Sequence, residues 1–257
     1  RSGLKITMKY DKLDRMTEKT YADGSKESYV YDAVGNVTET ISTTGAKTTY
    51  TYDSRNRNTS ITDALGNVTS FEYDEQARLT ARKDAAGNIT SYDYDANGNI
   101  IKTTYPDGTA VTSKYDARNR VVSQKNQYGY ETRYSYDGAD RLTAVTDAYG
   151  NRYTYGYDSN GNLVTVTDAK EQVTAYTYDA AGRVSTVRNA LGKTMAYSYD
   201  EIGNITKYKD YAGIVTTYAY DDMNQLVKKT VGSESTIYTY SDTGLLTKVK
   251  ASSGTVT

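Results

Sequence analysis

The sequence predicts an all-β protein built from tandem β-hairpins, because it combines a strict repeat, regular turn signals and strand-forming residues between the turns. A Tyr-Asp dipeptide recurs every 21 residues in eleven copies without a slip. The copies begin at Tyr10, Tyr31, Tyr52, Tyr73, Tyr94, Tyr115, Tyr136, Tyr157, Tyr178, Tyr199 and Tyr220. A fixed period of this length is typical of a repeat architecture in which each repeat is one supersecondary element.

The ends of the chain continue the same pattern in degraded form. A twelfth copy starts at Tyr240-Ser241, 20 residues after the last regular one, and the lead-in from Arg1 to Lys9 resembles the second half of a repeat. We therefore expect residues 1–257 to form a single array. Because the chain begins without Met and inside a partial repeat, we also expect it to be a fragment of a longer protein.

Each repeat carries two turn signals, at positions 2 and 12 when the tyrosine of the dipeptide is position 1. Both usually read Asp-x-x-Gly, as in Asp32 to Gly35 and Asp63 to Gly66. The Asp side chain can bond the backbone two residues on, and the Gly can take the positive φ of a type I turn followed by a bulge. Two turns per repeat predict one hairpin per repeat, and twelve repeats predict roughly 24 short antiparallel strands.

The segments between the turns, such as 36–41 and 67–73, are rich in Val, Ile, Thr and Tyr, which favour strands. Position 20 is aromatic in almost every repeat and lies two residues before the next Tyr-Asp tyrosine, so both rings share one face of the strand. We expect stacked repeats to form a tyrosine ladder two rings wide. Aliphatic residues at position 7, such as Val37 and Leu142, should pack beside the ladder.

Four repeats depart from the pattern in informative ways. Asn58 replaces the aliphatic residue of position 7, and Ser113 replaces the aromatic residue of position 20. Lys170-Glu171 removes a turn glycine, and the only proline, Pro106, occupies a turn position that suits its fixed φ. The repeat that begins at Tyr220 is one residue short, so its register is the least determined.

Composition excludes several kinds of site. The chain has no Cys, which excludes disulfides and thiolate metal sites, and no His, which excludes the usual general base and the Ser-His-Asp triad. The net charge is −1 without a basic block, so nucleic acid is not an expected partner. No stretch approaches ~18 consecutive apolar residues, so we expect no membrane insertion, and nothing in the sequence calls for a cofactor.

The repeated motif resembles that of the RHS or YD-repeat family. It reads Tyr-Asp-x-x-Gly-[Asn/Arg]-[Leu/Ile/Val]-Thr, is carried by Tyr31 to Thr38 and Tyr199 to Thr206, and covers nearly the whole chain. The resemblance implies hairpins stacked into one long sheet that spirals into a hollow shell. Members include bacterial polymorphic toxins, insecticidal toxin complexes, wall-associated proteins and teneurins. In toxin members the shell encloses a C-terminal effector, and in teneurins a similar barrel supports cell adhesion.

One part of the family pattern does not carry over. Toxin members end their shell with a proline-bearing Asp-Pro-x-Gly-type segment tied to self-cleavage, and Pro106 has no such context. The resemblance therefore transfers no catalytic residue.

Three residue sets could suggest ligand or reaction sites. The repeated aspartates could bind calcium, Glu131, Glu171 and Glu201 could supply a glycosidase pair, and the tyrosine ladder could stack sugars. The pattern favours turn formation for the aspartates, solvated surfaces for the scattered glutamates and packing for the ladder. Sequons such as Asn67-Val68-Thr69 arise from the repeat itself. We therefore predict no catalytic, metal or cofactor-binding residue.

The favoured function is a non-catalytic scaffold, a segment of an RHS-type shell that encases a toxin effector in a secreted or surface protein. An adhesive, glycan-binding module of a cell-surface protein is the alternative, and a polysaccharide-active enzyme is a third hypothesis. The expected partners are the rest of the shell and its effector. We also expect that copies can associate through unpaired edge strands, because the array is too short to close around a cargo.

Overall fold

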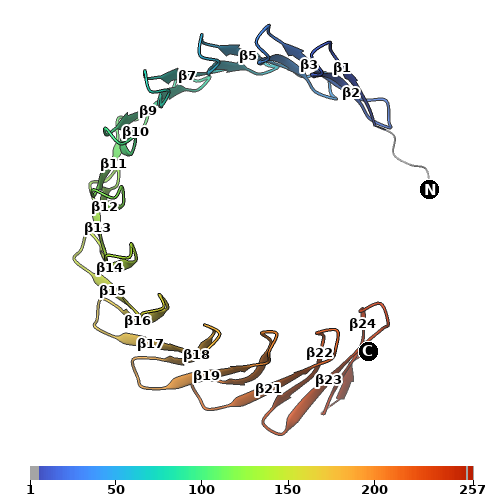
Figure 1. Ribbon diagram of the computed structural model, residues 1–257, viewed down its shortest axis with the longest axis vertical. Coiled ribbons are helices and arrows are strands. Elements are labelled where there is room, and N and C mark those ends of the chain that lie inside the picture. The colour runs from blue at the N-terminus through green and yellow to red at the C-terminus, as the bar shows by residue number, and fades with distance from the viewer. Residues whose placement is uncertain (1–5, 253, 257) are drawn as a thin grey trace. The chain divides into compact units, whose positions relative to one another are not determined.

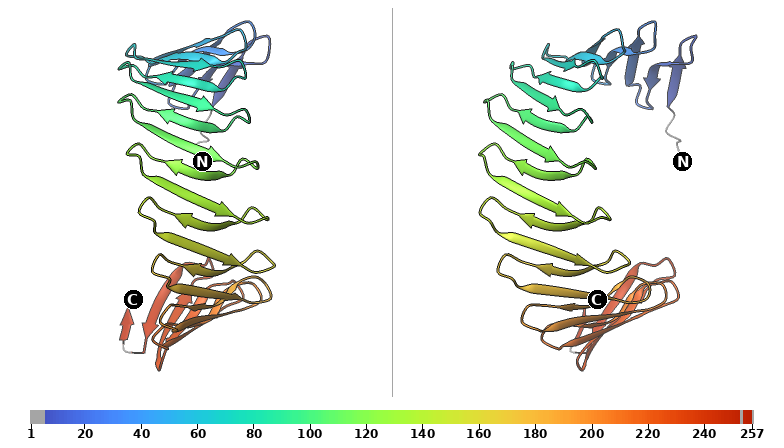
Figure 2. Two further views of the ribbon diagram at one scale, coloured as in Figure 1. Left: turned by 90° about the vertical axis from the view of Figure 1, so that its left-hand side faces the viewer. Right: turned by 60° about the vertical axis from the view of Figure 1, so that its left-hand side comes forward.

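The computed structural model describes residues 6–252 and 254–256, with side chains through residue 252. The chain divides into two compact units, Arg1–Glu131 (the N-terminal unit) and Thr132–Thr257 (the C-terminal unit). All regular structure in the described residues consists of strands, and these residues form no helix that could cross a membrane (Figures 1 and 2). The all-β fold is therefore confirmed.

The strands are short and evenly spaced along the sequence. Those of the N-terminal unit are β1 (Thr7–Tyr10), β2 (Met16–Thr20), β3 (Lys26–Tyr31), β4 (Val37–Ile41), β5 (Lys47–Tyr52), β6 (Asn58–Thr62), β7 (Val68–Tyr73), β8 (Leu79–Lys83), β9 (Ile89–Tyr94), β10 (Ile100–Thr104), β11 (Ala110–Tyr115) and β12 (Val121–Lys125).

The remaining strands are β13 (Glu131–Tyr136), which begins at the boundary, and those of the C-terminal unit. The latter are β14 (Leu142–Thr146), β15 (Arg152–Tyr157), β16 (Leu163–Thr167), β17 (Val173–Tyr178), β18 (Val184–Arg188), β19 (Thr194–Tyr199), β20 (Ile205–Lys209), β21 (Val215–Tyr220), β22 (Leu226–Val231), β23 (Glu234–Tyr240), β24 (Leu246–Ala251) and β25 (Gly254–Val256).

Within each unit, every strand pairs antiparallel with the next strand along the chain. The pairings run from β1 to β12 in the N-terminal unit and from β13 to β25 in the C-terminal unit. This order confirms one hairpin per repeat. The lead-in is also confirmed where it is described, because β1 pairs with β2 as the second strand of a repeat would, while residues 1–5 lie outside the described residues.

A β-bulge recurs beside each Tyr-Asp tyrosine. Tyr157 lies opposite Leu163 whereas Gly156 lies opposite Thr165, so the partner strand β16 carries one extra residue there. The same shift occurs at Tyr31 and Tyr199. Bulges increase local twist and bend the strand, and the sheet of each unit is visibly curved (Figure 1).

The sheet is a single layer and has almost no conventional core. Ala144, with 3% of its surface exposed, is the only buried hydrophobic residue among the described side chains, and none of the large ones is fully buried. The ladder tyrosines, such as Tyr155 and Tyr157, are half-buried, as are most aliphatic residues at position 7. Cross-strand neighbours, rather than a second layer, must therefore supply most of the packing energy.

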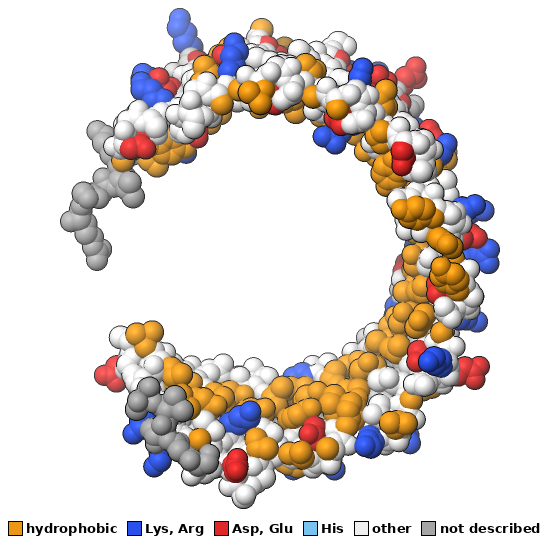
Figure 3. Space-filling model, turned by 180° about the vertical axis from the view of Figure 1, so that it is seen from behind, with side chains coloured by type: hydrophobic (Ala, Val, Ile, Leu, Met, Phe, Trp, Pro, Cys, Tyr) orange, Lys and Arg blue, Asp and Glu red, His pale blue; other side chains and the backbone are white. Residues whose placement is uncertain are grey.

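An apolar row runs along one face of the C-terminal unit. It alternates aromatic and aliphatic side chains, because Tyr155 lies opposite Val166 and Tyr176 lies opposite Val187. These valines occupy position 10, which the sequence reading did not assign to the ladder. The row accounts for the hydrophobic side chains that Figure 3 shows gathered along the concave side of this unit.

The short repeat at Tyr220 resolves into a tight hairpin. Val231 pairs directly with Glu234, so only Gly232 and Ser233 remain in the loop, and Gly232 has a φ of 58°. A two-residue loop needs such a positive φ to match the twist of its strands. The missing residue is therefore absorbed in this loop, and the register continues through β24.

Candidate functional site

Each first turn of the eleven regular repeats begins with an aspartate that caps it, and Ser241 takes this place in the twelfth. The Oδ1 atom of Asp53 accepts hydrogen bonds from the backbone N–H groups of Arg55 (2.8 Å) and Arg57 (3.0 Å). The backbone N–H of Asn56 closes the turn on the carbonyl oxygen of Asp53, at 3.0 Å. The bond from Arg57 is the main cause that holds the pKa of the Asp53 carboxyl below its usual value. The repeated aspartates therefore make the local bonds that the sequence predicts.

The residue at position 6 links one repeat to the next when it is arginine. The Nε atom of Arg57 donates to Oδ2 of Asp53 at 2.7 Å, and its Nη1 atom donates to the carbonyl oxygen of Asp74 in the next repeat at 2.8 Å. The guanidinium carbon lies 4.7 Å from the centroid of the Tyr73 ring. Arg57 thus satisfies a carboxylate, a carbonyl and a ring face at once, and two of these belong to the following hairpin.

The tyrosine of the dipeptide returns a bond to the previous repeat. The hydroxyl of Tyr73 donates to the carbonyl oxygen of Asn58 at 2.9 Å. We call this set of contacts between successive repeats the inter-repeat clamp. Tyrosines that make this bond include Tyr31, Tyr52, Tyr73, Tyr94, Tyr115, Tyr157, Tyr178, Tyr199, Tyr220 and Tyr240. Arginine arms that stack on the next ring are those of Arg15, Arg57, Arg78, Arg141 and Arg183.

At three of the four asparagines of position 6, a shorter version of the clamp replaces the arginine. The Nδ2 atom of Asn36 donates to Oδ2 of Asp32 at 2.8 Å and to Oδ1 of Asn56 in the next repeat at 3.0 Å. Asn99 makes the same bond to Asn119 at 2.8 Å, and Asn204 makes it to Asn224. These asparagines therefore link adjacent turns by an amide–amide hydrogen bond. Arginine instead links them through the tyrosine ring and a backbone carbonyl of the next repeat.

The prediction from the sequence assigned the tyrosines a role as apolar rings only, and it did not include the clamp. A signal for it was present, because the first position is Tyr in all eleven regular copies, whereas position 20 accepts Phe71 and Ser113. A position that never accepts Phe in place of Tyr is one at which the hydroxyl group itself is needed. The alternation of Arg and Asn at position 6 was a second signal.

The three glutamates considered for catalysis lie in different parts of the fold. Glu131 accepts a hydrogen bond from the Ser123 hydroxyl at 2.5 Å, in the N-terminal unit. In the C-terminal unit, Glu171 lies in a second turn with a φ of 61°, and Glu201 lies in a first turn. First and second turns stand at opposite rims of the sheet, so Glu171 and Glu201 do not meet as a catalytic pair.

The other candidate residues also have local roles. Asn67, in a sequon, donates from Nδ2 to Oδ2 of Asp63 at 2.8 Å, as part of a second turn. No group of three or more carboxylates that could hold a metal ion occurs among the described residues. Asn58 is exceptional, because its buried side-chain oxygen has no hydrogen-bond partner while its backbone carbonyl serves the clamp.

Family comparisons agree with this geometry. The Teneurin YD-shell family model matches residues 1–152, and the RHS Repeat model matches residues 157–194 and 199–236. The chain belongs to the RHS/YD-repeat family. The first match alone covers more than half of the sequence, and the two together leave few regular repeats outside. No curated protein matches the chain.

Solved structures of Tc toxin components share the fold of this YD-repeat chain. The crystal structure of TcdB2-TccC3 matches 96% of the chain with a TM-score of 0.68 and 16% sequence identity. The crystal structure of TcdB2-TccC3-TEV gives 0.66 over 96%, and the Photorhabdus luminescens Tc holotoxin pore gives 0.51 over 96%, both at 16% identity. The chain spans only 16% of the first two structures and 17% of the third.

Proposed function

We propose that the chain is a non-catalytic scaffold, a segment of an RHS-type shell that encases an effector in a secreted or cell-surface protein. The inter-repeat clamp is the observation that carries the proposal. In most regular repeats it commits positions 1, 2 and 6 to holding one hairpin against the next. A chain whose recurrent polar residues bond to one another is built to extend a sheet rather than to act on a substrate.

The apolar row supports an enclosed cargo as the partner. It is a contiguous set of half-buried tyrosines and valines on the concave face of the C-terminal unit. Apolar surfaces of this kind generally mark a contact with another polypeptide or ligand. In the proposed shell the row faces the effector, and the opposite, hydroxyl-rich face meets solvent. Association between copies through end strands stays a prediction.

Photocrosslinking in the full-length protein tests the orientation that this function requires. A photoreactive phenylalanine analogue replaces Val166, on the apolar row, or Thr177, an exposed residue on the opposite face. After irradiation, mass spectrometry should find effector peptides attached at position 166 and none at position 177. Equal yields at the two positions, or attachment at position 177 alone, would contradict the proposed function.

A further inference from the structure

Asparagine directly precedes glycine at two places in the chain, and both lie in first turns, at positions 4 and 5 of their repeats. The turns are almost identical in sequence, with Asp-Ala-Asn-Gly-Asn over residues 95–99 and Asp-Ser-Asn-Gly-Asn over residues 158–162. The two asparagines, Asn97 and Asn160, are both exposed, and the glycines after them have φ values of 89° and 90°. The two sites therefore match in sequence, exposure and backbone conformation.

An Asn-Gly pair can react with itself, because glycine has no side chain to shield its backbone nitrogen. That nitrogen attacks the Cγ atom of the asparagine and forms a new C–N bond. The side-chain amide nitrogen leaves as ammonia and takes the proton that the backbone nitrogen gives up. Water then opens the cyclic succinimide at either carbonyl group and yields aspartate or isoaspartate. The net reaction consumes water, releases ammonia and needs no oxidant or metal.

The next repeat restrains the side chain of Asn97 but not that of Asn160. The Nδ2 atom of Asn97 donates to Oδ1 of Asn119 at 3.0 Å, so this amide is tied to the following hairpin. The residue that takes the place of Asn119 in the repeat after Asn160 is Gly182, which has no side chain. Within the described part of the chain, the Asn160 side chain makes no hydrogen bond. It is therefore free to turn toward the backbone nitrogen of Gly161.

The turn itself opposes the attack equally at both sites. The backbone N–H of Gly161 donates to the carbonyl oxygen of Asp158 at 3.1 Å, and that of Gly98 donates to the carbonyl oxygen of Asp95 at 3.2 Å. Each of these bonds must break before the glycine nitrogen can attack. The side-chain anchor is therefore the feature that distinguishes the two sites.

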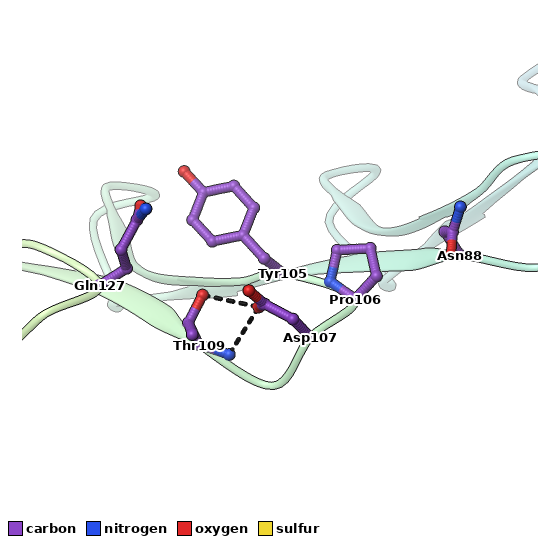
Figure 4. A pocket seen from close by; sticks show the side chains of 6 residues that line it. All are labelled: Asn88, Tyr105, Pro106, Asp107, Thr109 and Gln127. Carbon is purple, nitrogen blue, oxygen red and sulfur yellow. Dashed lines mark hydrogen bonds between the residues drawn. The ribbon is translucent and has the colours of Figure 1, made fainter.

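Aspartate before glycine can cyclise in the same way with loss of water, but these aspartates are restrained. Figure 4 shows Asp107 in an open cavity beside Pro106, which Asn88 and Gln127 of the neighbouring repeats also line. Its Oδ1 atom accepts hydrogen bonds from the backbone N–H (2.9 Å) and the hydroxyl (2.7 Å) of Thr109. Bonds of the same kind hold the carboxylates of the other two, Asp23 and Asp137.

We propose that Asn160 is a site of spontaneous deamidation. An isoaspartate at this position adds a methylene group to the backbone of the turn between β15 and β16. The Oδ1 atom of Asp158 accepts the backbone N–H groups of Asn160 (2.9 Å) and Asn162 (2.8 Å), and the added group moves these donors apart. The carbonyl oxygen of Asp158 also accepts a hydrogen bond from Nη1 of Arg141 in the preceding repeat, at 3.1 Å. The modification therefore loosens the turn and one contact of the inter-repeat clamp.

Incubation of the full chain in mildly alkaline buffer, followed by peptide mapping with mass spectrometry, tests the site. Loss of one hydrogen bond changes an equilibrium by about fivefold, so Asn160 should deamidate about fivefold faster than Asn97. In the urea-unfolded chain the two rates should agree, because the local sequences match. Hydrogen exchange of the β16 amides should rise as isoaspartate accumulates. Equal rates in the folded chain, or faster conversion of Asn97, would overturn the proposal.

A reciprocal exchange of the anchor provides the matched controls. Gly182→Asn supplies the missing acceptor, because an added side chain meets no atom within 4 Å there and asparagine tolerates the φ of 78°. This variant should slow the deamidation of Asn160 to the rate of Asn97. Asn119→Gly should raise the rate at Asn97 to that of Asn160, and circular dichroism confirms that each variant is folded. Unchanged rates in both folded variants would show that the anchor does not control the site, and the proposal would fail.

Discussion

The two units share their turns and clamps but differ in the row of side chains at position 10. In the N-terminal unit this row is mostly polar and consists of Lys19, Thr40, Ile61, Arg82, Thr103 and Gln124. In the C-terminal unit it begins with four apolar residues, Val145, Val166, Val187 and Tyr208, before Lys229. Apart from Ser113, which lies opposite Gln124, the residue opposite position 10 is aromatic in both units, as the pairs Tyr29–Thr40 and Tyr155–Val166 illustrate.

The comparison distinguishes the contacts that hold the sheet together from the side chains that the face of the sheet exposes. Polar residues at position 10 are tolerated because they find partners on the same face. Lys19 lies opposite Glu27, and Glu27 also accepts a hydrogen bond from the Tyr29 hydroxyl at 3.2 Å. The clamps at the rim occur in both units, whether position 10 is polar or apolar, so position 10 can vary with what the face contacts.

The largest expected effect comes from removing a clamp tyrosine inside a unit. Tyr157→Ala loses the ring under Arg141, at 4.7 Å, and the hydroxyl bond to the Leu142 carbonyl, at 2.9 Å. We expect about 2–3 kcal/mol of lost stability in urea unfolding. Tyr10→Ala removes a residue that is 55% exposed on the first strand, and should cost far less. Equal costs would mean that the clamp contributes little.

A smaller effect should follow from changing a turn glycine. Gly150 has a φ of 86°, a conformation that a β-branched residue resists, and no atom within 4 Å would obstruct a side chain there. Gly150→Val should therefore cost about 1–2 kcal/mol through backbone strain alone. Lys170→Val changes a turn whose positive φ is taken by Glu171, so it should be nearly neutral. Indistinguishable urea midpoints for the two variants would contradict this assignment.

Exchanging position 10 between the units tests their difference directly. Val166→Thr should cost about 1 kcal/mol, because it removes an apolar contact from the row opposite Tyr155. Thr40→Val should be neutral or stabilise by a few tenths of a kcal/mol, because it adds such a contact opposite Tyr29. If Thr40→Val destabilised as strongly as Val166→Thr, the polar row would be a structural requirement of the N-terminal unit.

Acid should affect the two units alike, since both use the same aspartate caps. The backbone hydrogen bond from Arg57 lowers the pKa of Asp53, and the one from Arg141 lowers the pKa of Asp137. A lowered folded-state pKa gives stability that is present above the unfolded value of about 3.9 and is lost as pH falls through the folded value. Urea unfolding between pH 6 and pH 2 should therefore show stability falling below about pH 4.

A matched pair of variants assigns that loss to the caps. Asp53→Asn and Asp137→Asn remove one titrating cap from each unit, and each should make the fall in stability with acid slightly shallower. A steeper fall in either variant would show that the titrating groups lie elsewhere.

The sequence was sufficient for the hairpins because period, turn chemistry and strand propensity are all local. It was not sufficient for the contacts between side chains of successive repeats. Glycine is expected at position 5, yet Asp14, Ala77 and Asp140 adopt φ values of 58°, 66° and 64° there. All four position-6 asparagines follow a glycine, whereas nearly all arginines follow a larger residue. The two positions therefore vary together as parts of one contact between turns.

The same limit applied to the candidate sites. Pro106 was recognised as a turn proline, but the cavity beside it needs Asn88 and Gln127 from the neighbouring repeats. Residues about 20 positions apart become neighbours only once the hairpins are paired in register. The apolar row was missed for a related reason, because position 10 faces the ladder only through the bulge beside each tyrosine.

The most direct test of the clamp is a double-mutant cycle on one arginine and the ring it covers. The guanidinium carbon of Arg183 lies 4.6 Å from the centroid of the Tyr199 ring, with no other repeat between them. Arg183→Met, Tyr199→Leu and the double variant are compared by native-state hydrogen exchange of the β19 amides. Arg183→Met combined with Tyr157→Leu, two repeats from Tyr199, is the control pair. We predict a coupling of about 0.5–1 kcal/mol for Arg183 and Tyr199 and none for the control pair. Additive effects for Arg183 and Tyr199 would contradict the claim that side-chain clamps hold successive hairpins together.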